Sequence, residues 1–184
     1  MICGLEVTDL TRAIYPNIEN GQALTNQYFL EHTILCPRNV EVDEINSFMC
    51  SLFPGESRTY SSADSIQAAE DGAQYPVEYL NSVNTGSLPP SQFEVKIGVP
   101  LMLLRNLDPD LGLYNGIRLR LMWITNRVLH VKIISRSYVG EMAFIPRIKL
   151  IFSEELAFKL YRAQFPIRLA FGMTINKYQG HWEQ

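Results

Sequence analysis

The chain has few of the residues that most often bind metals through nitrogen or sulfur. It contains three cysteines and three histidines among 184 residues, and none of them has a metal-ligand spacing. The odd cysteine count, at Cys3, Cys36 and Cys50, indicates free thiols in a reducing compartment rather than a disulfide framework. We therefore expect no metal site.

Long apolar runs are also missing. No stretch approaches the roughly 20 apolar residues of a membrane span, and no basic leader precedes an apolar segment. The composition, 47% hydrophobic and 19% charged, is that of a globular protein with one domain or two small ones. These features predict an intracellular protein without a membrane partner.

An excess of positive charge is absent as well. The formal net charge is −3, which argues against a generic basic protein that coats DNA. The charge is uneven, however, because acidic residues concentrate before residue 95 and basic residues outnumber acidic ones from Lys96 to Lys177. A local patch in the second half is therefore the place to expect any nucleic-acid contact.

The first 55 residues contain patterns of short helices and one buried strand. Residues 5–15 and 27–30 predict helical segments, and Thr33–Pro37 predicts a strand stopped by proline. Asn39 is expected to cap a helix whose apolar side comprises Val40, Ile45, Phe48, Met49 and Leu52. At this turn Arg38 and Asn39 form either a plain cap, which we favour, or an anion site at the helix N-terminus.

The middle of the chain changes from polar, mixed sequence to a β pattern. A strand is expected near residues 58–62, a loop or poorly formed helix over 61–75, a short helix over 75–83, and a linker over 85–90. From Gln92 several short strands follow, with turn signals at Asn115-Gly116 and Asn126-Arg127 and an end or bend at Pro146. Their density predicts a small antiparallel barrel over residues 92–158.

Residues 164–181 are the most informative stretch. Apolar residues alternate with small or polar ones from Phe165 to Asn176, which predicts a half-buried strand. A polar cluster containing Lys177 and Gly180 follows. It is either an ordinary loop after a buried strand or a phosphate site, since lysine supplies a point charge and glycine permits close backbone approach.

The amino-acid sequence of this stretch resembles a known motif. Thr-Ile-Asn-Lys-Tyr-Gln-Gly, preceded by Gln-Phe-Pro-Ile-Arg-Leu-Ala-Phe, resembles the fifth motif of the Pif-type (petite integration frequency) DNA helicases. These include the helicases of Helitron transposons and are related to RecD-type enzymes, which move 5′ to 3′ on single-stranded DNA. Tyr178, Gly172 and residues 181–183 depart from the usual pattern.

Two further segments resemble the same family, in the same order along the chain. Ile-Leu-Cys-Pro-Arg-Asn-Val-Glu-Val-Asp-Glu-Ile-Asn resembles the opening of its second RecA-like domain. Gly-Val-Pro-Leu-Met-Leu-Leu-Arg-Asn-Leu-Asp-Pro, Gly-Leu-Tyr-Asn-Gly-Ile-Arg-Leu and Phe-Ile-Pro-Arg-Ile resemble its inserted Src-homology-3-like barrel. The resemblance implies an α/β fold: a partial RecA-like domain (1–91 and 159–184) with an inserted small antiparallel β-barrel (92–158).

The resemblance also implies site residues. Carried over residue by residue, the DNA-binding set comprises Thr174, Asn176, Lys177, Arg105 and Asn106, and the set near the ATP phosphates comprises Gln179 and Gly180. Hydroxyl, amide and ammonium groups hold a phosphate backbone without reading its sequence.

Six more basic residues are weaker candidates for a DNA-binding face. Strand alternation puts Arg118 and Arg120 on one side of a strand. The alternative, favoured for each, is an exposed face charged for solubility and edge protection. Tyr114 and Trp123 are either base-stacking residues or, more commonly, core aromatics. The six basic residues are Arg118, Arg120, Lys132, Arg136, Arg147 and Lys149.

The resulting hypothesis is a fragment of an ATP-dependent 5′–3′ DNA helicase that supplies single-stranded DNA contacts and one edge of the ATP cleft. Its partners would be single-stranded DNA and the remainder of a helicase core, in the nucleus or an organelle. The chain alone is expected to hold no cofactor, whereas ATP and Mg²⁺ are implied for a full-length relative. The alternatives are a non-catalytic module that docks nucleic acid or protein, and a decayed transposon-derived remnant.

We predict no ATP hydrolysis by this chain alone. Phosphoryl transfer needs a phosphate cradle, a metal and a catalytic arginine together. The sequence has no Gly-x-x-x-x-Gly-Lys-Ser/Thr loop, and the resemblance places the sixth motif with its arginine after Gln184. Phosphate release by purified protein, with and without single-stranded DNA, checks this. DNA-stimulated turnover would contradict it.

Overall fold

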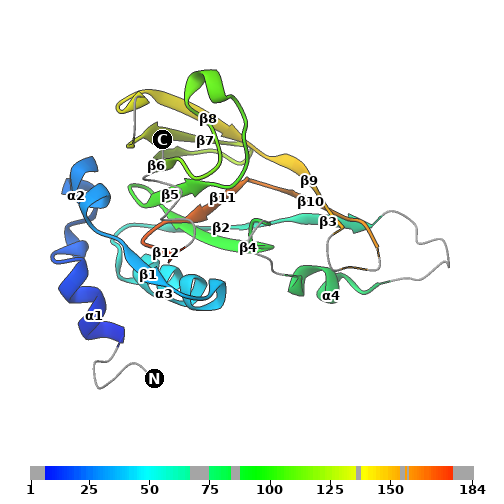
Figure 1. Ribbon diagram of the computed structural model, residues 1–184, viewed down its shortest axis with the longest axis horizontal. Coiled ribbons are helices and arrows are strands. Elements are labelled where there is room, and N and C mark those ends of the chain that lie inside the picture. The colour runs from blue at the N-terminus through cyan, green and yellow to red at the C-terminus, as the bar shows by residue number, and fades with distance from the viewer. Residues whose placement is uncertain are drawn as a thin grey trace.

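The computed structural model describes residues 7–66, 75–83, 88–135, 138–153, 156 and 158–175 (Figure 1). Most of the regular structure is β, with a few short helices. No helix in these ranges is long and apolar enough to cross a membrane. The helices are α1 (Val7–Ile14), η1 (Ile18–Ala23), α2 (Asn26–Glu31), α3 (Asn39–Leu52), α4 (Val77–Ser82) and η2 (Pro109–Leu111).

The strands form four small sheets. The largest has the order β11-β5-β6-β7-β8, the second β3-β10-β9, and two pairs are β2-β4 and β1-β12. The strands are β1 (Ile34–Cys36), β2 (Ser57–Ser61), β3 (Ala63–Ile66), β4 (Gln92–Lys96), β5 (Pro100–Leu103), β6 (Arg118–Ile124), β7 (Val128–Ile133), β8 (Met142–Pro146), β9 (Ile148–Phe152), β10 (Leu160–Gln164), β11 (Ile167–Leu169) and β12 (Gly172–Thr174).

The five-stranded sheet is antiparallel throughout and contains most of the strands expected between residues 92 and 158. The turn at Asn115-Gly116, the hairpin at Asn126-Arg127 and the bend after Pro146 lie where the sequence predicts them. The strand order does not close on itself among the described strands, so the barrel stays a prediction. β11, from the later fifth-motif stretch, forms one edge of this sheet.

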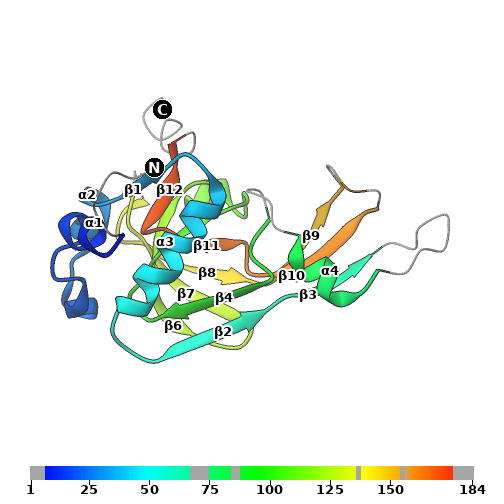
Figure 2. The same cartoon turned by 90° about the horizontal axis from the view of Figure 1, so that it is seen from below.

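The parallel pair β1-β12 brings together segments far apart in the sequence. Ile34 pairs with Gly172 and Cys36 with Thr174, and α3 begins three residues after β1 ends. Figure 2 shows α3 running beside this pair. β1 followed by α3 is the strand-and-helix half unit that the sequence predicts for residues 33–52.

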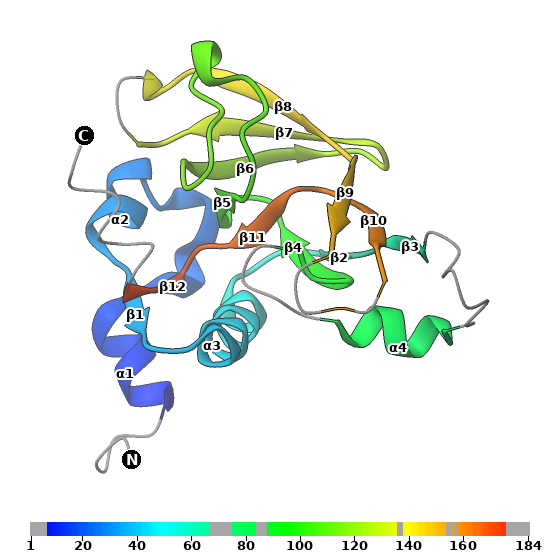
Figure 3. The same ribbon diagram turned by 45° about the vertical axis from the view of Figure 1, so that its right-hand side comes forward.

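A second layer extends from the main body as an arm. β3, β9, β10 and α4 lie together at one end of the molecule in all three ribbon views (Figures 1–3). The arm has its own hydrophobic cluster, separate from the main one. Its buried members are Leu80, Leu88, Leu150, Phe152, Phe158 and Leu160.

Arg162 is the polar centre of the arm and is fully buried. Its guanidinium donates to both carboxylate oxygens of Asp64 at 2.7–3.1 Å, and to the backbone oxygens of Leu80 (2.9 Å), Val83 (3.0 Å) and Pro89 (3.1 Å). A buried charge is tolerated only when it is paired and its donors are satisfied, and here both conditions hold. The Arg162 side chain therefore connects β10 with β3 and with the segments on either side of residues 84–87.

Three predictions from the sequence are wrong in detail. Residues 164–175 do not form one half-buried strand; they divide among β10, β11 and β12, and almost all are buried because other elements cover both sides. Residues 63–66 form β3 instead of a loop or helix, because β10 supplies a pairing partner. The buried side of α3 comprises Val42, Asn46, Met49 and Cys50, whereas Val40 is exposed.

We expect Arg162→Ala to lower the free energy of unfolding by about 3–5 kcal/mol, because it leaves the Asp64 carboxylate buried and unpaired. Asp64→Ala should cost a similar amount, and the double variant less than the sum, since both lose one interaction. Urea unfolding followed by circular dichroism measures this. Lys159→Ala, an exposed site just before β10, is the control. A loss below 1 kcal/mol for Arg162→Ala would contradict the prediction.

Candidate nucleic-acid interface

The candidate interface lies at the carboxyl ends of β1 and β12. Because the two strands run parallel, their last residues, Cys36 and Thr174, are register partners at the same edge. Thr174 is half-buried and Ile175 after it is exposed. Polar groups beyond the carboxyl ends of parallel strands are where ligands bind in open α/β sheets.

Thr174 shares a small cavity with two other polar residues. The cavity, about 10 Å³, is lined by Asn39 at the first turn of α3, Arg168 in β11 and Thr174, together with apolar groups. Arg168 Nη1 lies 3.4 Å from Asn39 Oδ1, and Arg168 Nε lies 3.3 Å from the Asp43 carboxylate. A hydroxyl, an amide and a guanidinium therefore meet where the strand pair ends.

Asn46 holds the connection that leads to Thr174. It lies on the buried side of α3, and its Nδ2 donates to the backbone oxygens of Leu169 (2.9 Å) and Gly172 (3.2 Å). Its Oδ1 accepts from the Gly172 amide at 2.8 Å. A single helix side chain thus satisfies backbone groups on both sides of the β11–β12 bend.

Two more buried side chains bind the same bend. Arg118 Nη2 donates to the oxygen of Ala170 (2.9 Å), and the Tyr15 hydroxyl lies 2.6 Å from the oxygen of Phe171 and 2.8 Å from that of His32. Burial raises the pKa of Tyr15 well above its usual range, so the hydroxyl keeps its proton at neutral pH. The approach to Thr174 is fixed from three separate elements.

The favoured prediction for the strand-to-helix turn, a plain cap made by Asn39, is wrong, while the alternative of an anion site stays a prediction. Arg38, not Asn39, occupies the N-cap position, and it makes no side-chain cap. Its Nε donates to Glu41 at 2.9 Å, so its charge is offset locally. Asn39 is the first helical residue and faces Arg168 instead.

Arg105 and Asn106 lie in the loop that follows β5, far from Thr174 in the sequence. The Leu104 amide bonds to the Pro166 oxygen (2.8 Å), so this loop adjoins the start of β11, whereas Thr174 follows at the end of β12. Asn106 Oδ1 accepts from the Asn115 amide at 2.7 Å, which closes the loop on itself. These contacts fix the loop, and a shared DNA-binding role of Arg105 and Asn106 with Thr174 stays a prediction.

Four predicted site residues, Asn176, Lys177, Gln179 and Gly180, lie outside the described residues. Arg136 does too. Within the described ranges no group of histidine, cysteine and acidic residues is arranged to hold a metal. Cys36 and Cys50 are buried and form no disulfide, and burial raises the pKa of both thiols, that of Cys50 to about 11.

The basic face expected on β6 is wrong, because Arg118 and Arg120 are buried. Arg120 donates to the backbone oxygens of Gly98 (3.2 Å) and Leu24 (2.6 Å), and burial lowers its pKa. Both arginines share one side of the strand, as alternation predicts, but helices and loops cover that side.

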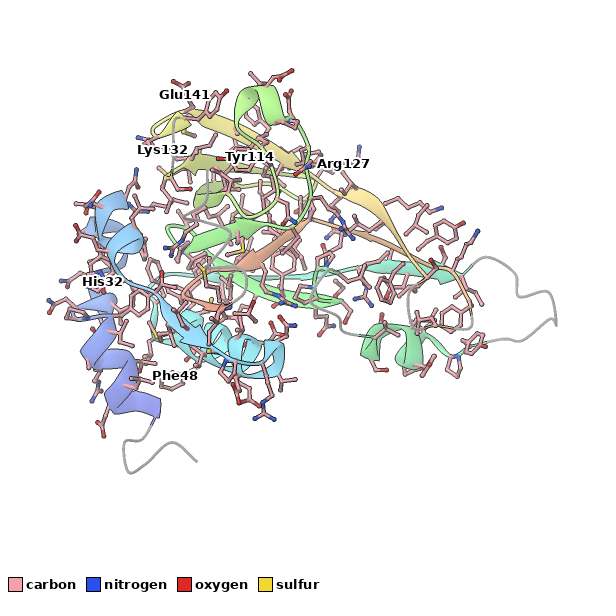
Figure 4. The ribbon with its side chains drawn as sticks, viewed as in Figure 1. His32, Phe48, Tyr114, Arg127, Lys132 and Glu141 are labelled. Atoms are coloured by element: carbon pink, nitrogen blue, oxygen red, sulfur yellow. The ribbon has the colours of Figure 1, made fainter. Side chains whose placement is uncertain are left out.

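The other candidates of this set lie on different elements of the fold. Arg147 stands over the rings of Tyr60 and Phe165, and Lys149 stands over Tyr161 in the arm. Trp123 is 61% exposed beside a bulge in β6. Figure 4 labels Lys132, Arg127 and His32 well apart on the molecule. Because Arg118 and Arg120 are buried, the six basic candidates do not form one exposed basic face.

Comparison with known proteins finds similarity to one class of proteins, the DNA helicases. Residues 78–126 match the family model for the 2B domain of the DNA helicase Pif1. The chain is 29% identical over 150 residues to the ATP-dependent DNA helicase PIF1 of Xenopus laevis, covering 80% of this chain and 22% of that protein. The Danio rerio counterpart is 28% identical over 152 residues, covering 80% of this chain and 21% of that protein.

Solved structures agree at the level of the fold. The Pif1 helicase from Candida albicans has a TM-score of 0.59 and 18% identity, covering 96% of this chain and 47% of that one. Bacteroides Pif1 bound to single-stranded DNA has a TM-score of 0.56 and 19% identity, covering 91% and 39%. The chain is therefore similar in sequence and fold to Pif1-type DNA helicases, and it spans about a fifth of the length of the curated relatives it matches.

Sequence reasoning missed the residues that position the interface. Asn46 and Arg118 lie within segments that resemble the family and Tyr15 does not, but the sequence assigned none of the three a role in holding this bend, and each contacts a segment far along the chain. Asn46 alone gave a signal: an amide on the side of a helix that otherwise carries Val42, Met49 and Cys50 needs buried partners.

We expect Asn46→Ala to lower the free energy of unfolding by about 2–4 kcal/mol, since three buried hydrogen bonds are lost and the Gly172 amide loses its acceptor. Hydrogen exchange at residues 172–174 should accelerate more than in the arm. The control is Ser47→Ala on the exposed side of α3, with an expected change within about 0.5 kcal/mol. Equal stability of the two variants would show that Asn46 does not hold the bend.

Proposed function

We propose that this chain is a single-stranded DNA-binding part of an ATP-dependent helicase of the Pif1 type. The observation that carries the proposal is the convergence of Thr174, Asn39 and Arg168 at the carboxyl edge of β1 and β12. Hydroxyl, amide and guanidinium groups are those that proteins use to hold a phosphate backbone. The kinship to PIF1 helicases and the fold shared with a Bacteroides Pif1 bound to single-stranded DNA support it.

The finer assignments belong to the same proposal. Thr174, Asn176 and Lys177 contact the DNA backbone. Arg105 and Asn106, in the β5–β6 loop, add further contacts to the same DNA strand. Gln179 and Gly180 face the ATP and Mg²⁺ that bind between this chain and the remainder of a helicase core. Movement is 5′ to 3′, and the antiparallel sheet around β5–β8 corresponds to the inserted barrel. The DNA contacts are sequence-independent.

Binding of a labelled single-stranded oligonucleotide, followed by fluorescence anisotropy at several salt concentrations, tests the proposal. We expect affinity to fall with salt, because each neutralised phosphate releases a counterion. Asn176→Ala with Lys177→Ala should weaken binding roughly tenfold and reduce the salt slope by about 0.7, the value for one charge on a single strand. Thr174→Val should weaken binding while leaving that slope unchanged.

Lys149→Ala is the matched control, since it removes one positive charge from the arm, away from the β1-β12 edge. It should leave affinity nearly unchanged. Equal losses of affinity for Lys149→Ala and Lys177→Ala would show that overall positive charge, and not the β1-β12 edge, accounts for the binding. A folded chain that does not bind at low salt would refute the proposed function.

A further inference from the structure

β8 is an edge strand whose outer side has no partner strand among those described. It pairs only with β7, and the sheet ends there (Figure 3). Its side chains alternate: Ala143 and Ile145 are buried, while Met142 and Phe144 are 53% and 60% exposed. An exposed apolar edge is a template for pairing with another chain.

The register identifies the backbone groups that face outward. The Ile133 amide bonds to the Glu141 oxygen at 2.9 Å, so Ile133 and Glu141 are a hydrogen-bonded pair. Such pairs recur at every second position of an antiparallel ladder. The next hydrogen-bonded pair is therefore Val131 with Ala143, and the one after it lies two residues closer to Pro146. Met142 and Phe144 therefore direct their amide and carbonyl groups away from β7.

A hollow of about 770 Å³ runs along this edge. One wall is β8 with the residues before it, and the other is the loop that carries η2. Leu111 on the opposite wall is 63% exposed, and Val139 is 54% exposed. The apolar residues that line the hollow are Leu107, Leu111, Leu113, Tyr138, Val139, Met142, Ala143, Phe144 and Pro146.

The charge of the hollow selects the kind of partner. Among the described residues that line it, the charged ones are Asp108 and Glu141, both acidic. Lys132 on β7 is opposite Met142 and is not among the described residues that line the hollow. Acidic groups repel a phosphate backbone and attract lysine or arginine, so a peptide fits here better than nucleic acid.

We propose that β8 accepts an extended segment of a partner protein, which adds a strand to the sheet. Backbone groups of Met142 and Phe144 would bond to it, and its alternate apolar side chains would enter the hollow between β8 and the η2 loop. A basic residue of the segment would lie against Asp108 or Glu141. This surface is separate from the β1-β12 edge and does not depend on the proposed helicase function.

The full chain and a fluorescein-labelled peptide, acetyl-Val-Lys-Val-Lys-Val-Lys-Val-amide, test this by anisotropy and amide exchange. We expect saturable binding and at least tenfold slower exchange of the Met142 and Phe144 amides. Methylating the peptide nitrogens at one set of alternate positions should abolish binding, and methylating the other set should not. Replacing its lysines by glutamate should weaken binding at least tenfold.

Phe144→Asp should weaken binding of the lysine peptide at least tenfold, and Glu141→Lys should weaken it about threefold or more. The matched control is Ile151→Asp, which changes an equally exposed residue of β9 (59%) and should have no effect. Unaltered binding by Phe144→Asp, or equal effects of the two methylation sets, would overturn the proposal. An oligonucleotide that slows the same amides, or self-association that Phe144→Asp abolishes, would assign the edge to DNA or to a second copy instead.

Discussion

Four consecutive backbone carbonyls, those of residues 169–172, each accept a hydrogen bond from a buried side chain. Tyr15, Asn46 and Arg118 supply these bonds from three elements that are distant in the sequence. An unpaired buried carbonyl is costly, so Asn46 and Arg118 stabilise the bend between β11 and β12, and Tyr15 adds a second donor to the Phe171 oxygen, which also accepts from the Ile34 amide. The position of Thr174, and with it the candidate interface, depends on this arrangement.

The buried arginines explain how an acidic chain can carry many basic residues in its second half without a broad basic surface. Arg118, Arg120 and Arg162 direct their guanidinium groups at backbone oxygens and, for Arg162, at the Asp64 carboxylate. The planar group has five donors and suits several acceptors at once, which lysine does not. Much of the positive charge therefore organises the fold, and little remains for steering a polyanion.

The sequence predicted elements whose limits are set by local chemistry, and it failed where distant partners decide. Asn115-Gly116, the hairpin at Asn126-Arg127 and α3 after Pro37 all lie where turn and helix signals put them. The alternation over 164–175 predicted one solvent-facing side, but almost all of these residues are buried, and no local pattern indicates that. Thr174 was found through a motif, whereas the contacts of its supporting residues with distant segments could not be read from the sequence.

The contact of Tyr15 with Phe171 spans 156 positions. During synthesis at about 5–20 residues per second, roughly 8–30 s separate the appearance of these two residues. For that interval the hydroxyl of Tyr15 has only its nearer partner, the oxygen of His32, and β1 has no partner in β12. The packing of α1 and β1 is therefore completed only after β12 has been synthesised.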